Sequence, residues 1–97
     1  MIKIVAQFFV KEDSIENAIW LSRDVAEKSK KENGCINYEV FQDDKKSGHL
    51  IMIEEWKSEE DLNMNVQSLH YINYISRITE IMENGKSFIV ESYHKLH

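Results

Sequence analysis

The chain has 97 residues, of which 42% are hydrophobic, and it contains no proline, three glycines and one cysteine. This composition is typical of one compact globular domain and excludes disordered and collagen-like chains. The net charge of −5, with dispersed basic residues, argues against nucleic-acid binding. No apolar run approaches the roughly 20 residues that span a bilayer, and the start lacks a signal-peptide cleavage site. We expect a cytoplasmic protein without a membrane partner.

The first part of the chain predicts a strand followed by a long helix. Residues 2–10 are rich in β-branched and aromatic side chains, as strands are. Asp13 and Glu16 have the spacing of a capping box, and apolar residues then recur at helical spacing. The helix is expected to end at Asn33-Gly34, because glycine commonly follows the last helical turn.

The middle of the chain predicts a β-hairpin. Residues 35–42 and 49–56 have strand character, and the polar segment 43–48 between them has turn composition. Glu54 and Glu55 are adjacent in the second of these strands, so their side chains point to opposite faces. They cannot form a paired-carboxylate site with each other.

The last part predicts a broken helical region and a final strand. Ser58 is followed three residues later by Asp61, which indicates a helix cap, and Ser68 can cap a second segment. We therefore expect a bend near Ser68, a helix end at Asn84-Gly85, and a strand over residues 87–95. The order β-α-β-β-α-β over residues 1–97 is that of a single ferredoxin-like α+β domain with a four-stranded antiparallel sheet.

Both faces of the predicted sheet carry apolar residues. Two helices cover only one face of a four-stranded sheet, so the second face would be bare in a monomer. A second copy packed face to face is the economical cover. We therefore predict a homodimer joined through the sheet face that carries Val5, Phe9, Ile51 and Ile53.

Four segments, in this order, carry a resemblance to a known family: Val10-Lys11-Glu12-Asp13, residues 32–39, Glu54-Glu55-Trp56 and Ser68-Leu69-His70-Tyr71. Together they resemble the antibiotic biosynthesis monooxygenase family, whose dimeric α+β barrel members include cofactor-free quinol oxygenases. Asn65 stands where the family often has a histidine, so a two-histidine site is not available. The haem-degrading relatives have an asparagine where this chain has Gln7. They also require a tryptophan and a histidine where Asn65 and Ile75 stand, so we disfavour haem degradation.

Two residues are candidates for catalysis. His70 lies at the family's Ser-x-His motif, and its ordinary pKa of about 6.5 suits proton transfer at neutral pH. The alternative is a histidine at a helix start that bonds Ser68 or a backbone carbonyl. Asn65 follows the same apolar stripe as Leu62 and Leu69, so it either donates to a substrate oxyanion or is a satisfied core amide.

Four residues are candidates for substrate binding: Trp56, Phe8, Tyr74 and Gln7. Trp56 either walls a pocket or only fills the core, and Gln7 either contacts a ligand or lines the dimer interface. Phe8 and Tyr74 are placed by periodicity alone. No metal site is predicted, because His49, His94 and His97 lack ligand spacing, and no glycine-rich phosphate loop indicates a nucleotide cofactor.

The resemblance implies a cofactor-independent monooxygenase that acts on a small phenolic or quinol-type molecule with dioxygen. An ionised, electron-rich ring can itself pass an electron to dioxygen, so the protein needs only a dry pocket, a base and oxyanion donors. The alternatives are an isomerase or binding protein for a small metabolite in the same fold, and a purely structural dimer.

Overall fold

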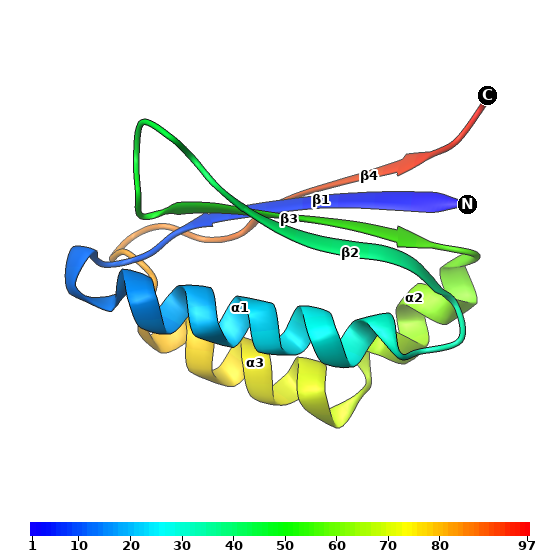
Figure 1. Cartoon of the computed structure of the whole chain (residues 1–97), viewed down its shortest axis with the longest axis horizontal. Coiled ribbons are helices and arrows are strands. Elements are labelled where there is room, and N and C mark those ends of the chain that lie inside the picture. Colours follow the sequence, from blue (N-terminus) through cyan, green and yellow to red (C-terminus); the bar gives the residue numbers. More distant parts are fainter.

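The computed structural model describes all 97 residues. The helices pack against one face of the sheet and form an α+β sandwich with it (Figure 1). Four strands form one antiparallel sheet in the order β2-β3-β1-β4. The elements are β1 (Ile2–Phe9), the 3-10 turn η1 (Glu12–Ser14), α1 (Ile15–Lys30), β2 (Cys35–Gln42), β3 (His49–Trp56), α2 (Glu59–Val66), α3 (Leu69–Glu80) and β4 (Ile89–His94). The predicted ferredoxin-like order is confirmed. None of the helices is long and apolar enough to cross a bilayer.

The predicted cap at Asp13 is wrong. The chain makes the turn η1 first, so α1 begins at Ile15, and its N-cap residue Ser14 makes no side-chain cap hydrogen bond. The Ser14 hydroxyl instead donates to Asp13 Oδ1 at 3.1 Å. A capping box requires the side chain of the N-cap residue to accept a backbone N–H, and here the two side chains satisfy each other.

The predicted break in the second helical region is confirmed at Ser68. Its backbone is extended, and its hydroxyl accepts from the backbone N–H of Tyr71 at 3.3 Å. The same hydroxyl donates to the carbonyl of Asn65 at 2.6 Å. Ser58 caps α2 in the same manner, accepting from the backbone N–H of Asp61 at 3.2 Å. Each serine satisfies a backbone donor that the first turn of its helix leaves free.

The core lies between the inner face of the sheet and the helices. Alternation along β1 and β3 directs every second side chain inward, as predicted. The largest fully buried side chains come from three strands and two helices: Trp56, Tyr38, Phe8, Leu50, Ile78 and Val25.

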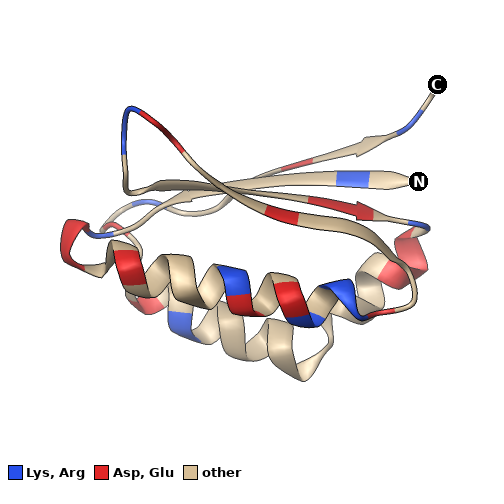
Figure 2. Cartoon of the chain, in the orientation of Figure 1, with Lys and Arg blue, Asp and Glu red and all other residues tan.

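The outer face of the sheet carries no helix (Figure 1). Charged residues gather on α1, whereas β1 and β2 carry few of them (Figure 2). Val5 of β1 pairs with Ile53 of β3, and Ile51 pairs with Phe41 of β2, so these apolar side chains adjoin one another on this face. All four are partly or well exposed in the isolated chain.

Candidate functional site

An apolar cavity of about 280 Å³ lies between the inner sheet face and the helices α2 and α3. Ile4 and Met52 line it from the sheet, and Leu62 and Ile75 line it from the helices. The break at Ser68 lets α2 and α3 approach the sheet at different places, so both contribute to the wall. Its volume is near the lower end of the roughly 300–1,000 Å³ typical of ligand sites. The cavity suits a small molecule.

Glu54 is the one carboxylate in the wall of this cavity. Glu54 is only 6% exposed, and its Oε1 accepts a hydrogen bond from the indole Nε1 of Trp56 at 3.0 Å. Burial raises the pKa of Glu54, although hydrogen bonds from Trp56 and from the Tyr38 hydroxyl oppose that shift. The cavity therefore holds a carboxylate that is more basic than one in solvent.

Three tyrosines surround this carboxylate in the cavity wall: Tyr38 of β2 and Tyr71 and Tyr74 of α3. The Tyr74 hydroxyl lies 2.9 Å from Ser22 Oγ and 3.2 Å from the sulfur of Met52. Burial raises the pKa of all three phenols above the ordinary value. They remain protonated at neutral pH, so each hydroxyl has one hydrogen bond to donate.

His70 and Asn65 meet at a different carboxylate. Glu32, just beyond the end of α1, places Oε2 2.7 Å from His70 Nε2 and 2.6 Å from Asn65 Nδ2. Asn65 Nδ2 also donates to Ser29 Oγ at 3.0 Å, and Asn65 is fully buried. The break at Ser68 thus brings the two predicted residues together at Glu32. They converge on α1 and not on the apolar cavity.

His70 lines a separate, polar cavity of about 150 Å³ between α1 and α3, together with Asp24, Lys28 and Arg77. Tyr74 lines both cavities and lies between them. A molecule in the apolar cavity does not contact His70 in this arrangement. The amide nitrogen of Asn65 already donates to Glu32 and Ser29, so it has no N–H left for a substrate oxyanion.

The four predicted substrate-binding residues do not share one pocket. Only Tyr74 lines the apolar cavity. Trp56 and Phe8 are fully buried in the core and do not line the cavity. The ring centroids of Phe8 and Phe88 lie 5.0 Å apart. Gln7 points to the outer sheet face, where its Oε1 lies 2.7 Å from His49 Nε2. Its odd position in β1 directs it away from the helices.

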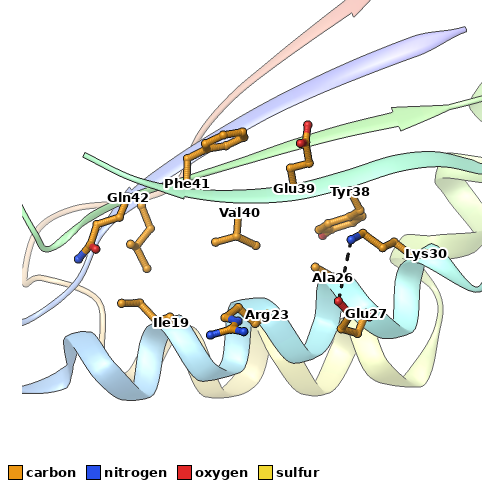
Figure 3. Close-up of a pocket in the computed structure, with 11 residues that line it drawn as sticks. Ile19, Arg23, Ala26, Glu27, Lys30, Tyr38, Glu39, Val40, Phe41 and Gln42 are labelled. Carbon is orange, nitrogen blue, oxygen red and sulfur yellow. Dashed lines mark ion pairs between the residues drawn. The ribbon is translucent and has the colours of Figure 1, made fainter. Parts of the chain in front are cut away.

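A further open groove of about 340 Å³ runs between α1 and β2 (Figure 3). Tyr38 and Val40 point from β2 toward the helix, whereas Phe41 points to the other side of the strand. Lys30 pairs with Glu27 across one helical turn at 3.9 Å. An exposed pair of this kind stabilises the helix surface only weakly, and the groove does not enclose a ligand.

A model of the antibiotic biosynthesis monooxygenase family matches residues 1–77. The chain belongs to the antibiotic biosynthesis monooxygenase family. A crystal structure of an antibiotic biosynthesis monooxygenase is 28% identical, with a TM-score of 0.84 over 94% of this chain and 96% of that one. A protein of unknown function from Bacteroides thetaiotaomicron, described as a possible oxidoreductase, is 26% identical, with a TM-score of 0.87 over 95% and 94% of the two chains.

A curated relative is longer than this family member. The uncharacterized protein sll1783 of Synechocystis is 25% identical over 81 residues, which are 84% of this chain and 55% of that protein. The chain therefore spans about half the length of that relative. This chain shares its fold with the two solved structures, and a shared fold does not by itself identify a substrate.

Sequence reasoning missed the cavity residues Glu54, Tyr38 and Tyr71 of this family member. The alternation of β3 contained a signal for Glu54, because Glu54 shares the inner face of the strand with the apolar Met52 and Trp56. A carboxylate between two buried apolar residues must be desolvated. Tyr71 lies three positions before Tyr74, and helical spacing alone did not decide which of the two reaches the pocket; in the structure both line it.

We expect Glu54→Gln to change the pH dependence of stability. Because burial raises the pKa of Glu54 in the folded state, the folded protein binds this proton more tightly than the unfolded chain. The wild type therefore loses stability as the pH rises from the unfolded value of about 4.3 through the folded pKa. Glutamine does not titrate, so the free energy of unfolding of the variant should rise relative to the wild type over that range.

Urea denaturation in a series of buffers from about pH 4 to about pH 8 measures this difference. Glu55→Gln is the matched control, since Glu55 is the neighbouring carboxylate and pairs with Lys3 at 3.4 Å on the outer face. The difference in the free energy of unfolding between Glu55→Gln and the wild type should not rise with pH. A Glu54→Gln difference that stays constant or shrinks as the pH rises contradicts the prediction.

Proposed function

We propose that this protein is a cofactor-independent monooxygenase that oxidises a small phenolic or quinol-type molecule with dioxygen in the cytoplasm. The observation that carries this proposal is the apolar cavity between the sheet and helices α2 and α3, with Glu54 as its one carboxylate and three protonated tyrosines around it. Membership of the antibiotic biosynthesis monooxygenase family supports the reaction type.

The chemistry requires little from the protein. A phenol with a hydrogen on the para ring carbon reacts with dioxygen to give a quinone and water, so the substrate itself supplies all four electrons. The phenolate form passes the first electron to dioxygen, and an apolar cavity opposes formation of that anion unless a base and donors assist. The Tyr71 hydroxyl is the suitable donor to the ring oxygen, because the Tyr38 hydroxyl donates to Glu54 and the Tyr74 hydroxyl contacts Ser22 and Met52.

Within this proposal, His70 and Asn65 act at a distance from the substrate. Their hydrogen bonds to Glu32 tie the start of α3 and the end of α2 to the end of α1. The same break between helices sets the positions of Leu62 and Tyr71 in the cavity wall. Trp56 acts through its hydrogen bond to Glu54.

We also propose that the protein is a homodimer joined through the outer face of its sheet. Val5, Ile51, Ile53 and Phe41 form the apolar part of that face, and no helix of the chain covers them. A chain of 97 residues has a small core, and face-to-face packing of two sheets would enlarge it.

Oxygen-electrode measurements with a panel of neutral phenols and quinols test the activity. We expect oxygen uptake that matches substrate loss one to one, and that continues after exhaustive chelation and flavin removal. Ala6→Leu should suppress it, because Ala6 lines the cavity and the added volume fills it. Val5→Leu is the matched control on the opposite face of the same strand. Binding of the panel without oxygen uptake would favour the isomerase or binding alternative.

A further inference from the structure

We propose that Glu54 is the base that removes the phenolic proton, and that the cavity thereby selects uncharged phenols and quinols. This inference rests on the proposed function, because it assigns the proton transfer of that reaction to one residue. It also specifies that the substrate is uncharged.

Glu54 is the one carboxylate in the cavity wall, and its ionised form is the one side chain there that can accept a proton. The other polar residues of the wall are the three tyrosines, which stay protonated, and Asn63, which does not titrate. His70 lines the polar cavity on the other side of Tyr74. A phenol bound between the sheet and helices α2 and α3 therefore has Glu54 as its available acceptor.

The position of the Glu54 carboxylate is held by its neighbours. Trp56 is fully buried, and its indole N–H holds Oε1 at 3.0 Å. The Trp56 ring is in turn packed edge-on against Tyr38, with ring centroids 6.4 Å apart. A base fixed in this manner needs no reorganisation when a substrate enters.

The proposed steps balance without a cofactor. The phenol O–H bond breaks and an O–H bond forms on Glu54, and the phenolate then reduces dioxygen by one electron. The resulting radicals combine at the para ring carbon, and the peroxide anion takes the proton back from Glu54. Glu54 next removes the hydrogen of that carbon as a proton while the O–O bond breaks. The released hydroxide takes this proton and leaves as water, so Glu54 returns to its ionised form.

The charge of the cavity sets the substrate class. Its wall contains one carboxylate and no lysine, arginine or histidine. An anionic ring, such as one that carries a carboxylate group, would be desolvated beside Glu54 without a positive partner. An uncharged quinol instead donates a hydrogen bond to Glu54 and leaves its ring against apolar side chains.

The test compares Glu54→Gln with the wild type on two readouts. Glutamine keeps an oxygen that accepts from Trp56, so the variant should fold, and its unfolding temperature checks this. With a neutral phenol from the panel that carries a hydrogen on its para ring carbon, kcat should fall about a hundredfold or more. Under anaerobic conditions, calorimetry should show that the wild type binds 1,4-hydroquinone in preference to 4-hydroxybenzoate, and that Glu54→Gln largely removes this preference. Glu55→Gln should leave both readouts unchanged.

The outcomes separate the inference from the function it rests on. Oxygen uptake that survives in Glu54→Gln overturns the role of Glu54 as base and leaves the proposed function standing. Equal preference for the two ligands in wild type and variant overturns the charge selection. If the wild type takes up no oxygen with any phenol or quinol of the panel, those with a para hydrogen included, the proposed function fails and the base role fails with it. In that case the anaerobic binding preference for 1,4-hydroquinone over 4-hydroxybenzoate still tests whether the cavity selects uncharged ligands.

Discussion

Replacing Ile53 with aspartate is expected to dissociate the proposed homodimer. Ile53 lies on the central strand β3, beside Val5 of β1 and opposite Glu39 of β2, on the outer face of the sheet. Burying an unpartnered carboxylate there costs on the order of 3 kcal/mol or more, which raises the dissociation constant at least about a hundredfold. In the monomer this side chain is partly exposed, so the folded domain should survive.

Sedimentation equilibrium at micromolar concentration measures the effect. The wild type should sediment at twice the chain mass of 11.5 kDa, and Ile53→Asp at the chain mass. Leu69→Asp is the control, because Leu69 is 74% exposed at the start of α3 and lies on the helical side of the domain. A monomeric wild type would refute the sheet-face dimer. An Ile53→Asp protein that remains dimeric would assign the interface to another surface.

Phe9 is a less decisive position for this test. Its ring stacks on His49 at 4.4 Å between centroids, and the amines of Lys46 and Lys86 lie 4.8 Å and 5.3 Å from the ring centroid. An aspartate there would have positive groups close by, which would offset part of its desolvation cost. Glu39 offers no such compensation near Ile53.

Trp56→Ala is expected to destabilise the fold by about 3–5 kcal/mol, because it leaves a large cavity in the core. Trp56 is 0% exposed and packs against Tyr38. The change also removes the indole donor from Glu54, a buried carboxylate whose desolvation is then less well compensated. A typical domain has only about 5–15 kcal/mol of stability, so the loss is a large share of the total.

The second tryptophan of the chain provides the control. Trp20 on α1 is 62% exposed, so Trp20→Ala should change the free energy of unfolding by no more than about 0.5 kcal/mol. Urea titration monitored by circular dichroism compares the two variants on the same scale. Similar losses at both positions would show that Trp56 is not a principal core residue.

Local sequence patterns predicted most of the fold. The alternation of β1 and β3, the caps at Ser58 and Ser68 and the break between α2 and α3 involve residues within a few positions of one another. The one wrong cap, at Asp13, is also local. Here a 3-10 turn and a capping box compete for the same side chains, and their spacing is similar.

The sequence by itself determined the order of the elements and the two-sided sheet, because periodicity and caps depend on neighbouring residues. The family was indicated separately, by the resemblance of four short segments in family order. Only the tertiary structure decided which side chains share a cavity. His70 meets Glu32 across 38 positions, and Tyr74 meets Ser22 across 52, so these contacts depend on how α1 and α3 pack. Glu54 lines the cavity because the helices leave space above that part of β3. The alternation of β3 places Glu54 on the inner face, but no local pattern predicts the cavity beside it, since that cavity arises from the packing of elements that are distant in the chain.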